Sequence, residues 1–216
     1  MEHSAIVNLA KGMATATAAW LTEKYQSGFE QRLLSEALLI IPLVDYFNSQ
    51  KGWNLFGEWH ELSSRGAKPG DVNIDLVAER DEEKVLIEFK YLKKATDQRL
   101  IKDMIKLALS SNPSHTRLLL VAHSPVCQNR GQSRSTLVRA LASAGQPTNF
   151  RLTQCASQVV EVVRDQRIKL FLTSEEGKHA SRIMTYDPLL TSFAAEHVAS
   201  CQNASENVSV FSVSRI

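Results

Sequence analysis

The pattern of hydrophobic and polar positions in the middle of the chain predicts four strands and one helix. Four apolar stretches have the length and composition of strands: 53–59, 72–78, 85–91 and 116–123. The loop 63–70 is rich in turn-forming residues, and the acidic turn 79–83 joins the second strand to the third. We therefore expect the first three strands to form an antiparallel meander. Thr96 or Asp97 can cap a following helix that runs to about Leu109.

Two helical patterns come before these strands. Apolar residues recur at loose helical intervals near the start: Ile6, Leu9, Met13, Trp20 and Leu21. This segment fits either an arm or dimerisation helix, or a helix packed on the core. A second helix is expected over 29–41, and Pro42 either kinks it or begins its next segment.

The C-terminal part continues the mixture of helices and strands. Residues 133–144 and 188–199 have helical patterns, whereas 159–163, 168–172 and 208–213 have strand patterns. The two middle strands fit a hairpin around residues 164–167.

The element order predicts one α/β domain over residues 1–216, with strands and covering helices interleaved. We divide it into an N-terminal helical arm (1–28), a core (29–124) and a C-terminal elaboration of further strands and helices (125–216). The hydrophobic share of 44% and the charged share of 22% are those of a globular protein and exclude a disordered or fibrous chain.

One predicted strand carries charges where the pattern requires apolar residues. Glu88 and Lys90 lie within 85–91, where every other position is apolar or aromatic, and residues two apart point to the same face of a strand. The other two Glu-x-Lys triplets, Glu82/Lys84 and Glu176/Lys178, lie in polar turns and loops. A carboxylate and an ammonium on a buried strand are costly unless they are paired or bind a ligand.

Asp75 repeats this anomaly on the neighbouring strand, between Ile74 and Leu76. If the two strands pair around the acidic turn, Asp75 lies near Glu88. Two adjacent carboxylates repel, and a hard divalent cation such as Mg²⁺ or Mn²⁺ removes that repulsion. The alternative is a buried ion pair of Lys90 with Glu88 or Asp75.

Glu36 is a third charge on an apolar stripe, since Leu33, Leu39 and Ile40 surround it at helical spacing. It points inward or along the edge of that stripe. The alternative is a salt bridge to Arg32, one turn back, or a place at the rim.

These residues together resemble the PD-(D/E)XK nuclease superfamily, which has the restriction-endonuclease-like fold. The resemblance covers Phe29 to His123 and consists of the order helix, three strands, helix, strand (αβββαβ), with Glu36, then Asp75, then Glu88-Phe89-Lys90. Ile74, not proline, precedes Asp75. Asp71, which follows Pro69-Gly70, is a rival for the first acid, and we prefer Asp75 because it lies inside the strand.

The resemblance implies a mixed sheet flanked by helices and metal-dependent hydrolysis of a phosphodiester, in DNA in preference to RNA. By the same resemblance, Asp75, Glu88 and the Phe89 carbonyl would hold Mg²⁺, with Mn²⁺ as a substitute. Lys90 would orient or help to deprotonate the attacking water, and Glu36 would bind a second metal or a metal-bound water. A metal lowers the pKa of its water, and a nearby cation stabilises the charge that develops.

Charge is distributed unevenly along the chain, although its net value is only +2. Residues 104–160 contain six Lys and Arg and no Asp or Glu, which is typical of a phosphate-binding surface. The expected nucleic-acid contacts are Arg130 and Arg134 in this stretch and Lys93, Lys94, Arg99 and Lys102 just before it. A solvated basic surface is the alternative.

The remaining features concern location and partners. Cys127, Cys155 and Cys201 form no metal motif and suit a reducing, cytoplasmic environment, and Met1–Trp20 has no signal-peptide pattern. The longest apolar run, Ala37–Val44, is too short to span a bilayer. A homodimer is compatible with cutting two strands, but no residue demonstrates one. Two rival functions stay open: a binding module of the same fold without cleavage, and an unrelated α/β protein with a buried ion pair.

Overall fold

The computed structural model describes residues 1–29, 34–60, 73–92, 97–110, 112–123, 136–156, 158–165, 168–202 and 207–216. Its helices are α1 (His3–Gln26), the short 3₁₀ helix η2 (Glu36–Leu39), α2 (Ile40–Ser49), α3 (Asp97–Leu109), α5 (Thr136–Ala144) and α6 (Ser174–Tyr186). Its strands are β1 (Asn54–His60), β2 (Asn73–Arg80), β3 (Glu83–Leu92), β4 (Thr116–His123), β5 (Thr148–Ala156), β6 (Val159–Arg164), β7 (Ile168–Leu172), β8 (Ser192–Gln202) and β9 (Asn207–Arg215).

The nine strands of the described residues belong to one mixed sheet in the order β1-β2-β3-β4-β9-β8-β5-β6-β7. Strands β1 to β3 form the expected antiparallel meander. Strand β4 lies parallel to β3, because α3 carries the chain back across the sheet between them. The C-terminal strands β8 and β9 insert beside β4, so that both halves of the chain share one sheet.

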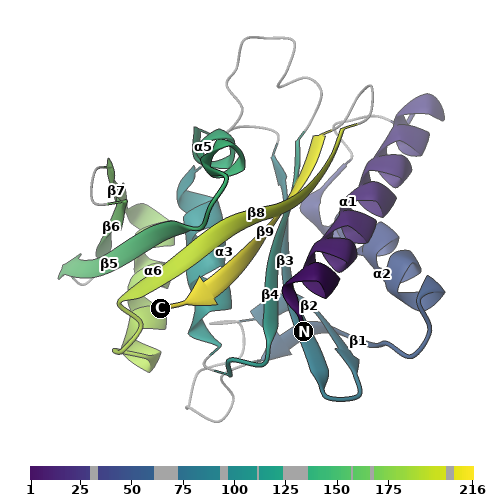
Figure 1. Cartoon of the computed structure of the whole chain (residues 1–216). Helices are drawn as coiled ribbons and strands as arrows, with labels where there is room; N and C mark the ends of the chain where they lie inside the picture. The colour runs from purple at the N-terminus through teal and green to yellow at the C-terminus, as the bar shows by residue number, and fades with distance from the viewer. Residues whose placement is uncertain are drawn as a thin grey trace.

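Helices cover both faces of this sheet (Figure 1). Helices α1 and α2 pack on one face, and α3, α5 and α6 pack on the other. Strand β3 is buried on both sides because its side chains alternate between the two layers. Leu86 and Leu92 join the α3 side, whereas Ile87 and Phe89 join the α1 side. Glu88 and Lys90 therefore lie on the face that α3 covers.

Helix α1 packs on the sheet along its length. Its buried residues follow helical spacing: Leu9, Ala10, Met13, Ala14, Thr17, Ala18 and Leu21. Near its end, the hydroxyl of Tyr25 lies 2.6 Å from that of Tyr91 on β3. The helical pattern predicted for residues 1–28 is confirmed, and its buried face corresponds to core packing, the second of the two roles considered for it. No described helix has the length and apolar character that crossing a membrane would require.

Most of the predicted elements are confirmed, with boundary shifts of a few residues. The helix expected over 29–41 lies further along the chain: η2 begins at Glu36 and leads into α2, which ends at Ser49. Pro42 stands in the first turn of α2, where its missing N–H costs nothing. The hairpin of β6 and β7 is confirmed. The helix predicted over 133–144 appears as α5, and residues 133–135 lie outside the described part.

One predicted helix is wrong. Residues 188–199 contain Ala, Glu and His, which favour or tolerate a helix locally, but Ser192–Gln202 forms strand β8. Pairing with β9 on one side and with β5 on the other overrides that weak local preference.

Strand β5 and helix α6 were not predicted at all. In β5 the buried Phe150 and Leu152 supply the alternation that would have indicated a strand.

Candidate active site

The turn between β2 and β3 fixes which residues of the two strands face each other. It contains two residues, Asp81 and Glu82, and Asp81 adopts a positive φ of 53° that asparagine, aspartate and glycine tolerate best. The ladder then runs from Arg80↔Glu83 to Leu76↔Ile87. The next opposed positions are Asp75 and Glu88, so the turn places these two carboxylates side by side.

At this point each carboxylate accepts a hydrogen bond from the backbone of the opposite strand. The N–H of Asp75 donates to Glu88 Oε1 at 3.3 Å, and the N–H of Phe89 donates to Asp75 Oδ2 at 3.1 Å. The two side chains thus replace strand pairing where the ladder ends. The prediction that Asp75 lies near Glu88 agrees with this arrangement.

Glu88 is almost fully buried, with 1% of its surface exposed. Its Oε1 lies 2.7 Å from Nζ of Lys106, a buried residue of α3. Burial raises the pKa of Glu88 well above its ordinary value, and Asp103 and Asp75 add to this, while Lys106 opposes it. Burial alone would lower the pKa of Lys106, but Glu88, Asp103 and Asp75 outweigh it and raise that pKa. The charged form of Glu88 and that of Lys106 therefore stabilise each other.

Lys90 follows Glu88 on the same face and is held by two carboxylates. Its Nζ lies 2.7 Å from Oε1 of Glu36 in η2 and 3.0 Å from Oδ2 of Asp103 in α3. Burial lowers the pKa of Lys90, but Asp103 and Glu36 more than offset this and raise it above its ordinary value. Lys90 is consequently a fixed cation. Of the two roles expected for it, orienting the water and offsetting charge fits this environment better than removing a proton.

Helix α3 supplies two site residues that were not among those predicted from the sequence, Asp103 and Lys106. Both are buried, and they lie three positions apart on the helix, so they face the sheet together. The signal was present in the sequence, because both stand among the apolar positions Met104 and Leu107 that mark the inward face. Like Glu36, each is a charge on an apolar stripe.

The ion pairs have partners different from those expected. Lys90 pairs with Glu36 and Asp103, and not with Glu88 or Asp75. Glu36 reaches the site from a rim position, with 40% of its side chain exposed. Its alternative partner, Arg32, lies outside the described residues, as does Asp71, the rival first acid.

The expected nucleic-acid contacts are only partly within the described chain. Arg99 on α3 is 61% exposed, with its Nε 3.4 Å from Oε1 of Glu176, and Lys102 lies 3.2 Å from Asp103 Oδ1. Lys93, Lys94, Arg130 and Arg134 lie outside the described residues. Within the acid-free stretch, Lys106 and Arg117 are buried: Lys106 pairs with Glu88, and Arg117 donates to backbone carbonyls.

The carboxylate and carbonyl oxygens of this site suit a magnesium ion that takes few of its ligands from the protein. In the described part of the chain, no group of three or more His, Cys, Asp or Glu side chains is arranged around one point. Magnesium, however, is commonly held by one or two carboxylates, with water and substrate phosphate completing its shell. Asp75 and Glu88 offer two carboxylates, and among the described contacts Asp75 Oδ1 and Glu88 Oε2 make no hydrogen bond. The Phe89 carbonyl would be the third, backbone ligand.

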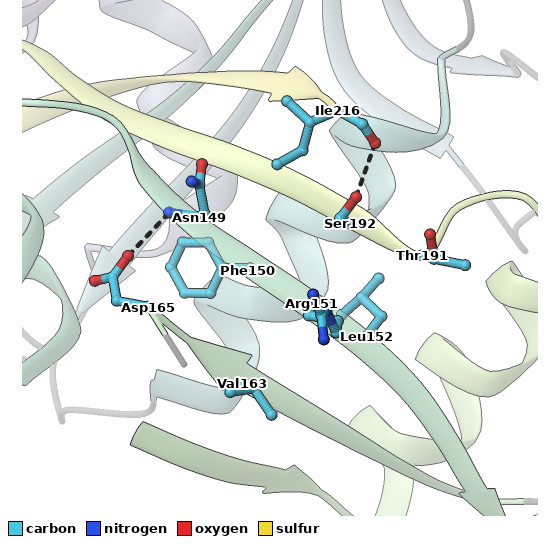
Figure 2. Close-up of a pocket in the computed structure, with 9 residues that line it drawn as sticks. All are labelled: Asn149, Phe150, Arg151, Leu152, Val163, Asp165, Thr191, Ser192 and Ile216. Atoms are coloured by element: carbon cyan, nitrogen blue, oxygen red, sulfur yellow. Dashed lines mark hydrogen bonds between the residues drawn. The ribbon is translucent and has the colours of Figure 1, made fainter. Parts of the chain in front are cut away.

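A separate pocket of about 750 Å³ opens at the far half of the sheet (Figure 2). Four consecutive residues of β5, 149–152, form one wall, and Ser192 Oγ donates to the carbonyl of the C-terminal Ile216 at 2.8 Å. Asp165 accepts a hydrogen bond from the N–H of Asn149 at 3.3 Å. Strands β4 and β9 lie between β3 and the strands β8, β5 and β6 that line this pocket, so it is no part of the carboxylate site.

No family model, curated protein or solved structure matches this chain. The arrangement of its own residues therefore carries the functional argument.

Proposed function

We propose that this chain is a Mg²⁺-dependent nuclease with a restriction-endonuclease-like core, acting on DNA in preference to RNA. The observation that carries the proposal is the opposed pair Asp75 and Glu88 at the end of the β2–β3 ladder, with the cation Lys90 two residues further on the same face. The element order from η2 and α2 through β1–β3 and α3 to β4 supports it, because it is the order that the resemblance implies.

Each residue has a task that follows from its surroundings. Asp75 and Glu88 would hold the ion, and their hydrogen bonds to opposite backbone N–H groups keep both carboxylates in place. When bound, Mg²⁺ would polarise the phosphoryl oxygen and lower the pKa of its water. Lys90, kept charged by Asp103 and Glu36, would orient the attacking water and offset negative charge in the transition state. In this arrangement Glu36 acts on Lys90, and a role as a second metal ligand would require it to leave that ion pair.

The test compares site variants with a matched pair at the other end of the same hairpin. Asp75→Asn, Glu88→Gln and Lys90→Met should each slow Mg²⁺-dependent cleavage of plasmid DNA by about 100-fold or more, as expected for loss of a metal ligand or a charge-stabilising group. Glu79→Gln and Lys84→Met disrupt a cross-strand ion pair of 2.8 Å remote from the site and should leave cleavage unchanged. If all three site variants cut DNA as the wild type does, the site assignment is wrong.

A binding module without cleavage is the second candidate, and one observation favours it. Lys106 and Lys90 already neutralise Glu88 and its neighbours, so the fold does not require a metal for charge balance. Calorimetric titration with Mn²⁺ separates the two candidates. DNA binding together with no Mn²⁺ binding would establish the module, whereas Mn²⁺ binding that Asp75→Asn removes would support the nuclease.

A further inference from the structure

Lys106 and a metal ion would use the same carboxylate. Lys106 Nζ lies 2.7 Å from Glu88 Oε1, and both side chains are buried beneath α3. Among the described residues this is the only ion pair of Lys106. Lys90, in contrast, is fixed by two carboxylates, neither of which is Glu88. Lys106 is therefore the cation whose place depends on Glu88.

A divalent ion on Glu88 would face that ammonium at close range. Interactions between charges a few ångströms apart are strong when burial limits screening by water and salt. The carboxylate's attraction for Lys106 would also weaken as its charge is shared with the metal. The lysine side chain can respond, because its four-carbon stem is flexible and its charge is a point that needs no fixed geometry.

We infer that Lys106 is a displaceable counter-ion: it holds Glu88 in the structure described here, competes with the metal for it, and on displacement serves the substrate phosphate as a second cation beside Lys90. The inference rests on the proposed function and deepens it. It assigns to α3 a role in coupling metal loading to binding of an anionic phosphodiester.

The first test is Mn²⁺ affinity, measured by calorimetry at pH 8 without DNA. Lys106→Met and Lys106→Gln should bind Mn²⁺ about tenfold more tightly than the wild type, as expected when a competing buried ion pair is removed. The glutamine can still donate a hydrogen bond to Glu88, which guards against a simple folding defect. Lys84→Met removes the same charge from the far end of β3 and should leave the affinity within about twofold of the wild type.

The second test follows the lysine itself. Brief acylation followed by peptide mass spectrometry should show Lys106 becoming several-fold more reactive when Mg²⁺ is added, whereas Lys90 should not change. At saturating Mn²⁺, Lys106→Met should cleave DNA about tenfold more slowly despite its tighter metal binding, because one phosphate-facing cation is lost.

The outcomes separate this inference from the proposed function. If the wild type fails to bind Mn²⁺, the proposed function falls and the inference falls with it. If the wild type binds Mn²⁺ but both Lys106 variants bind it equally or more weakly, or if Mg²⁺ leaves the acylation of Lys106 unchanged, the competition is wrong while the nuclease proposal stands. If Lys106→Met binds Mn²⁺ more tightly yet cleaves at the wild-type rate, the phosphate role is wrong.

Discussion

The ammonium of Lys90 on β3 lies 3.0 Å from a carboxylate oxygen of Asp103 on α3, the next helix along the chain. Asp103 is 1% exposed, whereas the other partner of Lys90, Glu36, has a side chain that is 40% exposed. The two carboxylates hold the same cation at similar distances but in different dielectric surroundings. Their contributions to stability should therefore differ.

Asp103→Ala should lower the free energy of unfolding by about 3 kcal/mol, because it leaves a buried ammonium without its buried partner. Glu36→Ala should lower it by about 1 kcal/mol or less, since water screens an exposed carboxylate and can replace it. Urea denaturation of both variants measures the difference. Equal losses would show that burial does not distinguish the two partners and that Asp103 does not fix Lys90.

Arg117 and Arg99 test how the basic residues divide between the interior and the surface. Buried Arg117 donates to the carbonyls of Ser110 and Asn112 at 2.7 and 2.6 Å, which ties the α3–β4 connection to β4. Arg117→Met should cost about 2–3 kcal/mol of stability by leaving these acceptors unpaired. It should not change DNA affinity measured on the folded protein.

Arg99→Ala should show the opposite behaviour. Its exposed guanidinium makes one long contact to Glu176, so stability should stay within about 0.5 kcal/mol of the wild type. DNA affinity in Ca²⁺ buffer should fall, and the slope of log affinity against log salt should decrease by about one. If Arg117→Met weakens DNA binding as much as Arg99→Ala does, this division is wrong.

Helix α6 contains a glycine, Gly177, whose replacement by alanine should destabilise the protein, although alanine usually stabilises a helix. A Cβ on Gly177 would lie 2.3 Å from the carbonyl oxygen of Gln158 and 2.5 Å from that of Leu172. Alanine normally stabilises a helix by about 1 kcal/mol relative to glycine, but here it would push α6 from β6 and β7 and cost about 2 kcal/mol or more. Thermal unfolding should show this loss for Gly177→Ala. The neighbouring exposed Lys178→Ala should change stability by less than about 0.5 kcal/mol, and equal behaviour of the two variants would refute the close approach.

The juxtaposition of Asp75, Glu88 and Lys90 could be predicted because it depends on local features. A two-residue turn and the period of two along a strand determine which side chains share a face. Asp103 and Lys106 depend instead on how α3 is rotated against the sheet. The sequence shows these two residues only as charges on an apolar stripe. Which residues they pair with can be known only from the folded structure.

The wrongly predicted helix has the same origin. The segment 192–202 is a strand because β9 and β5 pair with it, a constraint that its own composition does not contain. The cations of the acid-free stretch 104–160 do not all lie on the surface, since Arg117 makes internal hydrogen bonds and Lys106 pairs with buried Glu88. Linear charge counts cannot distinguish these residues from exposed Arg139 and Arg151.

The packing of α6 against α3 predicts a histidine with a lowered pKa. Among the described residues, His179 Nε2 is buried without a hydrogen-bond partner. Burial lowers the pKa of His179 below its ordinary value, and the nearby charges of Lys102 and Lys106 lower it further, while Asp103 opposes them. NMR titration should therefore give a pKa below about 6.5 for His179, the value expected for the unfolded chain.

The sign of the linked stability change follows from this direction. Because the folded state binds the proton less readily than the unfolded chain, the contribution of His179 is present above pH 6.5 and is lost as the pH falls toward its folded pKa. The wild type should accordingly lose stability relative to His179→Gln on acidification below pH 6.5. Lys102→Met should raise the pKa of His179, whereas the remote Lys84→Met should not. A pKa of His179 that stays the same in Lys102→Met would mean that α6 does not face the lysines of α3, because a charge removed at close range must alter the titration of a half-buried imidazole.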